Sequence, residues 1–397
     1  MFTYKRKRLG NNSKAVLIIV FILFAAIVFQ SSDGNSNEPT SKISIRLKWN
    51  KAYPKESYGN VRTGMLWSFS FLGAHLPKGC YDKAILTKDS SLFEIKIDEL
   101  GFSENAKQAL AVICDSIKKT DSYRKNNSID LSRFFVLTLH SSWHYYKITG
   151  VFNSLTEFNK HYKMGDAKNF GVTKSMVSHH DRLIRIKANK KILNTAFVAV
   201  EGGGSLQEST FDPQAYETMD IMPNGQLRFA VYNRQGNLIP SSPQSHGEAG
   251  KPSKCIWCHE LMIQPLFKEN VAIPSMMSNE EFGRLQQQLQ NKLSNYRKTL
   301  HTEIDYTKLQ DHTYLELLYI SFMEPNTERI RNEFPEMNNE QLAIIKKMNA
   351  HTCHEFPYIG TELYHRYYID SIMNINALKV PFSVREEIGM EMNYFIE

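Results

Sequence analysis

The sequence predicts an α+β fold, which runs from an N-terminal membrane segment through a mixed α+β region and a β-rich hairpin section to an attachment loop and a mainly helical part. Three observations predict it: short runs in which apolar and polar residues alternate, one Asn-Gly turn between two such runs, and helix-capping sequences that dominate after residue 278. A chain of 397 residues, 42% of them apolar, is long enough for two or three compact units. This composition excludes a collagen-like or wholly disordered protein.

The same patterns divide the chain into five sections. Residues 1–30 are expected to be a signal-anchor or signal peptide, residues 31–41 a flexible tether and residues 42–175 an N-terminal α+β domain. Residues 176–250 form the β-rich section, and residues 251–397 contain the attachment loop and the helical C-terminal region.

Basic residues are concentrated in the first section, where Lys5, Arg6, Lys7, Arg8 and Lys14 stand with no acidic residue among them. The formal net charge of the whole chain is +7, and this cluster accounts for most of it. Nucleic-acid binding requires a basic face on the folded part of a protein. We therefore expect no nucleic-acid partner.

Fifteen consecutive apolar residues, 15–29, follow the basic cluster. Positive charge followed by an apolar block predicts a secretory signal or a signal-anchor. The block is short for a membrane helix, which needs about 17–25 residues, and no clear Ala-x-Ala cleavage site follows it, so a retained anchor and a cleaved signal both remain open. Either alternative predicts that the chain is exported to the periplasm-facing side of the cytoplasmic membrane, and the first predicts membrane contact through residues 15–29.

Strands and helices are both predicted in the N-terminal domain. Alternation predicts strands over 43–49 and 93–97, and helical spacing predicts helices over 106–117, over 131–146 and from Ser154, whereas residues 61–76 are not assigned. Ser103 is an N-cap candidate for the first helix, and Ser154 with Glu157 has the sequence of a capping box.

Strands dominate the next section, and helices the last one. Strands are predicted over 183–186 and 196–200, a hairpin over 216–232 around Pro223-Asn224-Gly225, and a loop over 241–254. Helices are predicted over 278–300, over 311–323, over 339–349 and from Ser383.

One motif suggests chemistry: Cys255-Ile256-Trp257-Cys258-His259 has the C-x-x-C-H spacing of covalent haem attachment. Two thiols three positions apart reach the two vinyl groups on one edge of a porphyrin, and the adjoining imidazole ligates the iron. The motif predicts one covalent haem c held by Cys255 and Cys258, with His259 as the proximal ligand of the iron.

Other uses of a C-x-x-C pair remain open. A structural zinc site usually needs a second pair of ligands, and no second C-x-x-C occurs in the sequence. A thioredoxin-like redox pair requires a β-α-β context, whereas a Ser-, Pro- and Gly-rich stretch precedes Cys255. A structural disulfide suits an exported protein, although cysteines three apart close a strained ring.

In this motif the chain resembles the c-type cytochromes. The resemblance covers five residues, and it implies covalent haem at Cys255 and Cys258 and axial ligation by His259. The amphipathic helix that carries a glycine and an aromatic residue before the motif in small soluble cytochromes c is absent from this sequence. The order of strands over 183–232 followed by a late C-x-x-C-H is faintly similar to the cytochrome P460 type.

A haem used for electron transfer normally has a second axial ligand, whereas a catalytic haem leaves that position open. The candidates for a second ligand are Met276, Met277 and Met323, followed by His301 and His312. The favoured hypothesis is an exported, membrane-tethered cytochrome that passes single electrons to a redox partner protein. A peroxidase-like or P460-like oxidoreductase, and a non-catalytic envelope module with a haem-stapled loop, are the alternatives.

Two further clusters have metal-binding residue types. His179-His180-Asp181 is one, and His351, Cys353 and His354 with His365 form the other. A solvated loop is the competing interpretation of the first, and the second lacks a nearby second thiol. Cys80 and Cys114 are candidates for a disulfide, which would leave Cys353 unpaired.

Overall fold

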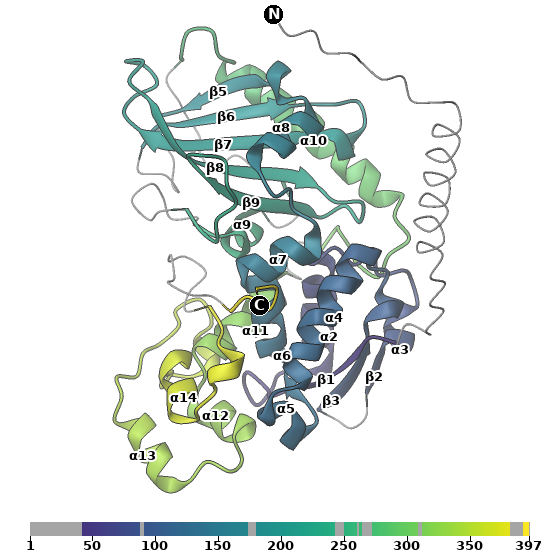
Figure 1. The fold of residues 1–397 in the computed structure, drawn as a ribbon, viewed down its shortest axis with the longest axis vertical. Coiled ribbons are helices and arrows are strands. Elements are labelled where there is room, and N and C mark those ends of the chain that lie inside the picture. Colours follow the sequence, from purple (N-terminus) through teal and green to yellow (C-terminus); the bar gives the residue numbers. More distant parts are fainter. Residues whose placement is uncertain are drawn as a thin grey trace, which may run out of the picture. The chain divides into compact units, whose positions relative to one another are not determined.

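A computed structural model describes residues 42–87, 91–173, 180–242, 250–259, 262–263, 272–308, 312–381 and 392–396. Within these residues the strands form two sheets, and helices pack against both (Figure 1). Residues 43–397 cluster into one compact unit. Its main hydrophobic core draws side chains from all three sections that follow the tether.

The smaller sheet has the strand order β2-β3-β1-β4. Its strands are β1 (Ser44–Lys48), β2 (Ile85–Thr87), β3 (Leu92–Lys96) and β4 (Ile129–Asp130). β3 is antiparallel to both β1 and β2, whereas β4 runs parallel to β1. The strands predicted over 43–49 and 93–97 are thereby confirmed.

The larger sheet is an antiparallel meander in the chain order β5-β6-β7-β8-β9. Its strands are β5 (Lys168–Val172), β6 (Arg182–Lys187), β7 (Ala196–Gly203), β8 (Asp212–Ile221) and β9 (Leu227–Asn233). The predicted hairpin is confirmed at β8 and β9, where Gly225 adopts a φ of 83° that suits glycine. Tyr145 and Tyr146 close the free edge of β9, since their hydroxyls accept the N–H groups of Phe229 and Val231, each at 3.2 Å.

Helices make up most of the rest of the described chain. They are α2 (Tyr58–Phe71), α3 (Cys80–Ala84), α4 (Glu104–Lys118), α5 (Asp121–Asn126), α6 (Leu131–Phe135), α7 (Ser142–Thr149), α8 (Leu155–Tyr162), α9 (Pro252–His259), α10 (Asn279–Lys298), α11 (His312–Met323), α12 (Thr327–Glu333), α13 (Asn339–Lys346) and α14 (Arg366–Ile372). Short 3-10 turns cover 97–100, 164–166, 192–194, 357–359 and 376–378, and a π-helical turn, η2, covers Val136–His140.

Local sequence rules explain where several of these helices begin. The hydroxyl of Ser103 accepts the N–H of Ala106 at 3.3 Å, and Ser278 forms a complete capping box with Glu281. The helix expected over 131–146 is interrupted, because α6 passes into the π-helical turn η2 and Ser141 is extended before α7 begins. The helix expected from Ser383 lies outside the described residues.

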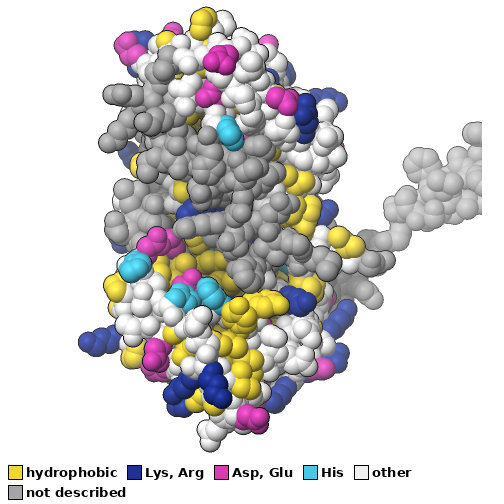
Figure 2. All heavy atoms as spheres, turned by 90° about the vertical axis from the view of Figure 1, so that its left-hand side faces the viewer, with side chains coloured by type: hydrophobic (Ala, Val, Ile, Leu, Met, Phe, Trp, Pro, Cys, Tyr) yellow, Lys and Arg dark blue, Asp and Glu magenta, His cyan; other side chains and the backbone are white. Residues whose placement is uncertain are grey.

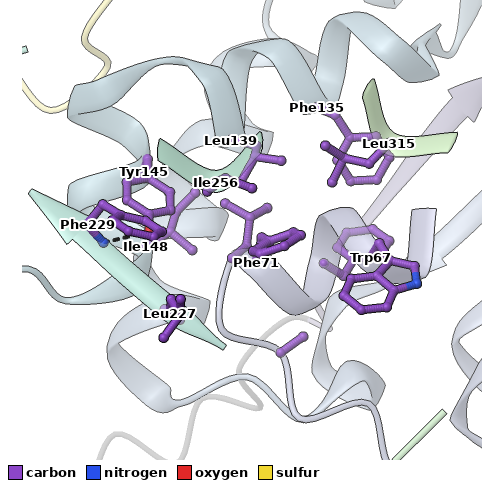
Figure 3. Packing of buried hydrophobic residues seen from close by; sticks show 14 of the residues in the cluster. Trp67, Phe71, Phe135, Leu139, Tyr145, Ile148, Leu227, Phe229, Ile256 and Leu315 are labelled. Carbon is purple, nitrogen blue, oxygen red and sulfur yellow. Dashed lines mark hydrogen bonds between the residues drawn. The ribbon is translucent and has the colours of Figure 1, made fainter. Parts of the chain in front are cut away.

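Helix α2 occupies the stretch that the sequence left unassigned. Met65, Trp67 and Phe69 are buried on different sides of it, so it has no polar face and no helical apolar stripe. Gly64 lets α2 approach α11 closely, since a Cβ at this position would lie 2.8 Å from Leu318 Cδ1. Figure 3 shows Trp67 and Phe71 of α2 packed in the core with Leu315 of α11.

Buried ion pairs fix the C-terminal helices to the N-terminal part of the chain. Three guanidinium groups face three carboxylates: Arg133 with Asp370, Arg329 with Asp130, and Arg366 with Glu333. Each guanidinium in this network has a carboxylate partner. The ion pairs therefore hold the C-terminal helices against the N-terminal part of the chain.

The predicted fold class requires correction. The structure is mixed α+β with two sheets, but none of the helices within the described residues is long and apolar enough to cross a membrane. The segment 15–29 lies outside those residues. The attachment loop is also corrected, because Cys255–His259 lies on helix α9 and not in a loop.

Candidate functional site

Helix α9 places the C-x-x-C-H residues on a single side. Positions i, i+3 and i+4 of an α-helix share one face, so Cys255, Cys258 and His259 point in similar directions. Cys255 is buried and Cys258 is half-buried. The helix therefore places two sulfurs and one imidazole on the same face, as haem attachment requires.

The intervening residues of α9 anchor it in the core. Ile256 is only 2% exposed and lies among Leu139, Tyr145 and Phe229 (Figure 3). The ring of Trp257 lies 5.2 Å from that of Tyr319 on α11, centroid to centroid. One side of α9 is thus held by packing while the other presents the motif.

Cys255 and His259 of the motif face one side of the larger sheet, and Cys258 is not among the described residues of the wall that they share. Residues that alternate along β6, β7, β8 and β9 point to this side because the strand pairs are in register. They include Arg182 and Ile184 on β6, Phe197 and Ala199 on β7, Glu217 and Met219 on β8, and Phe229 on β9. The ring of His259 lies 5.5 Å from that of Phe229.

These residues line a cavity of about 730 Å³, which includes the open space at its mouth. Cys255 and His259 of α9 form part of the wall, and Phe282 and Gln286 of α10 lie in it as well. Phe282 also stacks on Phe170 of β5 at 3.9 Å between centroids, which holds α10 against the sheet. A mainly apolar wall with a few polar groups is typical of pockets for small molecules and cofactors.

Burial determines the protonation of the motif. It lowers the pKa of His259 to about 4, an effect that a hydrogen bond to the Met262 backbone opposes and Arg182 reinforces, so the imidazole is neutral at pH 7. Burial, together with the negative charge of Glu217, raises the pKa of the Cys255 thiol well above its ordinary value. His259 Nδ1 is buried and has no hydrogen-bond partner. A neutral imidazole is the form of histidine that binds a metal ion.

One buried charge cluster borders the cavity. Arg182 contacts Glu201 and lies 2.7 Å from Glu217 Oε2, and both carboxylates hold its guanidinium firmly in the charged form by raising its pKa. The hydroxyl of Ser242 donates to Glu217 Oε1 at 3.2 Å. Two carboxylates and one guanidinium therefore border an otherwise mainly apolar pocket.

The three methionines proposed as distal ligands lie elsewhere. Met276 is half-buried, the backbone N–H of Met277 donates to Asn169 O at 2.9 Å, and Met323 is buried at the end of α11. None of the three lines the described wall of the cavity, whereas Met219 does. The sequence offered a weak signal for Met219 and Glu217, since both lie on the first strand of the predicted hairpin, two positions apart and therefore on the same face.

The other candidate residues are dispersed. His301 is exposed after α10, and the side chain of His312 lies outside the described side chains. His179 is outside the described residues, and Asp181 Oδ2 accepts the N–H of Leu206 at 2.6 Å.

The suggested disulfide is wrong. Cys80 and Cys114 are buried free thiols in the structure. Burial raises the pKa of Cys80 to about 11 and that of Cys114 to about 12, which leaves both as inert apolar groups.

Comparisons with protein-family models, with curated proteins and with solved structures gave no significant match. The function is therefore inferred from the site itself.

Proposed function

We propose that this protein binds one covalent haem c through Cys255 and Cys258 and transfers single electrons to and from a redox partner protein. One observation supports this above all: a C-x-x-C-H motif lies on a helix whose Cys255 and His259 line a mainly apolar pocket. When bound, the haem iron would supply the Fe(III)/Fe(II) couple.

The chain's own residues would perform distinct tasks at this site. Cys255 and Cys258 would hold the group covalently, and His259 would bind the metal through a neutral ring. Phe197 and Phe229 would exclude water from one side of the cavity. We infer that Met219, a methionine in the described cavity wall, would be the second protein residue that binds the iron.

Charge beside the cavity would tune this function. Glu201 and Glu217 lie with Arg182 in a buried setting, and carboxylates near a metal favour its oxidised, more positive form. We also propose an extracytoplasmic location, since basic residues followed by an apolar block suggest export.

Glu217 favours a second candidate function. Its carboxylate lies in the cavity wall, where an acid-base group could serve an oxidoreductase whose metal has an open position. Carbon monoxide distinguishes the two functions, because it binds an open position readily. Binding by the resting reduced protein would support the enzyme, and an unchanged reduced spectrum would support electron transfer.

The test of haem attachment is a visible spectrum of the full chain, purified after export from cells that have cytochrome c maturation machinery. We expect a haem spectrum that survives denaturation. It should be lost in a Cys255→Ala/Cys258→Ala variant and retained in Cys353→Ser, a matched control because Cys353 is also a half-buried free thiol. Absence of haem from the unmodified chain would contradict the proposal.

A further inference from the structure

Three potential metal ligands meet in the C-terminal part, away from the C-x-x-C-H motif. They are Glu324, at the end of α11, His351, in the segment after α13, and His365, which is the N-cap of α14. Histidine and acidic side chains gather on the face of the molecule drawn in Figure 2. Because Glu324 is distant in sequence from both histidines, the fold and not a local motif creates this cluster.

Backbone pairing brings the three segments together. His351 and Leu363 exchange two hydrogen bonds, N–H to carbonyl, each at 3.1 Å. The N–H of Tyr364 donates to Pro325 O at 3.1 Å, which ties the segment before His365 to the residue after Glu324. Leu363 and Tyr364 are themselves buried, so these connections are anchored in the core. These hydrogen bonds therefore fix the backbone positions of the three segments that carry the cluster.

The donor atoms are close enough to share an ion. One nitrogen from each histidine and one oxygen of Glu324 lie within 4.8 Å of one another, and His351 Nε2 is 3.1 Å from Glu324 Oε2. Two donors that bind one zinc ion tetrahedrally at about 2.1 Å each are about 3.4 Å apart. The widest gap in the cluster therefore has to close by at most about 1.4 Å, which side-chain rotations provide.

The histidines are arranged in a way that internal bonding does not explain. Their rings stack at 4.5 Å between centroids with an interplanar angle of 20°. His351 Nε2 is shielded from solvent, yet it has no hydrogen-bond partner, because its approach to Glu324 lacks hydrogen-bond geometry. A shielded nitrogen aimed at a carboxylate without a hydrogen bond is an unsatisfied polar atom, and a metal ion would satisfy it.

We propose that Glu324, His351 and His365 bind one divalent transition-metal ion, at a site separate from the haem motif. Two imidazoles and one carboxylate form a donor set used for zinc and for non-haem iron, and it leaves room for water ligands. His365 is exposed and the other two are half-buried, which gives the ion an entry path and open positions.

The site differs from the one that the sequence indicated. Cys353 packs against the apolar cluster of Phe356 and Leu363, and His354 is exposed, so neither joins His351 and His365 in the cluster. Glu324 is the third potential metal ligand in the cluster.

Zinc binding by the full, haem-loaded chain tests this proposal. After dialysis against Zn²⁺ we expect one tightly held zinc per chain by elemental analysis, and a higher thermal midpoint with Zn²⁺ present. Glu324→Gln and His351→Ala should each weaken zinc binding at least about tenfold in calorimetric titration. His354→Ala removes a neighbouring exposed histidine and should leave the affinity unchanged.

A second pair of variants separates this site from the haem motif. In Cys255→Ser/Cys258→Ser, zinc binding should persist although haem attachment is lost. The proposal is overturned if the unmodified chain retains no zinc, or if Glu324→Gln and His351→Ala bind zinc as tightly as it does. It is also overturned if zinc binding disappears with the two motif cysteines. Far-ultraviolet circular dichroism of each variant verifies that it is folded, and Glu324→Gln keeps the side-chain size if His351→Ala fails to fold.

Discussion

Protonation of His144 should release the C-terminal residues 392–396 and destabilise the fold at mildly acidic pH. The ring of His144 is wholly buried. Its Nδ1–H donates to Leu137 O at 2.6 Å, and its Nε2 accepts the N–H of Tyr394 at 3.0 Å. Only the neutral ring offers one donor and one acceptor, so a second proton on Nε2 would eliminate the bond to Tyr394.

The size of the effect follows from the two pKa values of His144. Burial lowers its pKa in the folded protein from 6.5 to about 4, partly offset by the bond to Leu137. The unfolded chain therefore takes up a proton first as the pH falls, and the stability contributed by the neutral ring is lost between about pH 6.5 and pH 4. The full loss is about 3 kcal/mol, of which about 2 kcal/mol falls between pH 7 and pH 5.

Urea unfolding at pH 7 and at pH 5 measures this loss. In a His144→Phe variant, which keeps a buried ring without ionisable nitrogens, the free energy of unfolding should fall by about 2 kcal/mol less over this interval than in the unmodified protein. Other titrating groups are common to both proteins and cancel in the comparison. His354→Gln, at an exposed position, is the control and should behave as the unmodified protein. Equal pH dependence in His144→Phe and the unmodified protein would refute the reasoning.

Three further changes test the ion network, the close helix approach and the cavity. Glu333→Gln should destabilise the fold by about 3–5 kcal/mol in urea unfolding, because it leaves the buried Arg366, now paired at 2.8 and 3.0 Å, without its full counter-charge; a loss below about 1 kcal/mol would contradict this. Gly64→Ala should cost about 1–3 kcal/mol in thermal unfolding, since the added methyl group would meet Leu318 at 2.8 Å, and an unchanged midpoint would show that the helices separate freely. Met219→Ala should open the second axial position, so the reduced variant would bind carbon monoxide, whereas an unchanged spectrum would exclude Met219 as a ligand.

Local patterns predicted the elements whose signals are local. The Asn-Gly hairpin of β8 and β9 depends on one turn whose backbone suits these residues, and α10 depends on the capping box at Ser278. Helix α2 was missed for the opposite reason. From Gly64 to Phe71 it is buried on all sides, so this half of its sequence lacks the polar face by which amphipathic helices are recognised.

Sites that the fold assembles were predicted only in part. The motif at Cys255 and His259 is contiguous, so it can be recognised in the sequence, and its haem chemistry stays a prediction. The cavity residues Met219 and Glu217 come from a strand, and Glu324 joins His351 and His365 only because a backbone bridge aligns their segments. Local patterns in the sequence do not indicate which strand faces which helix. The residues that surround each motif could therefore be identified only from the tertiary structure.

The mass of one peptide tests the central claim most directly. Trypsin cleavage after Lys254 and Lys268 yields peptide 255–268, which contains both motif cysteines. If the protein is a c-type haem protein, this peptide from exported material should carry the added mass of one haem, and its two sulfurs should resist alkylation. Two free, alkylatable sulfurs in that peptide, from cells that attach haem to a reference cytochrome, would contradict the claim.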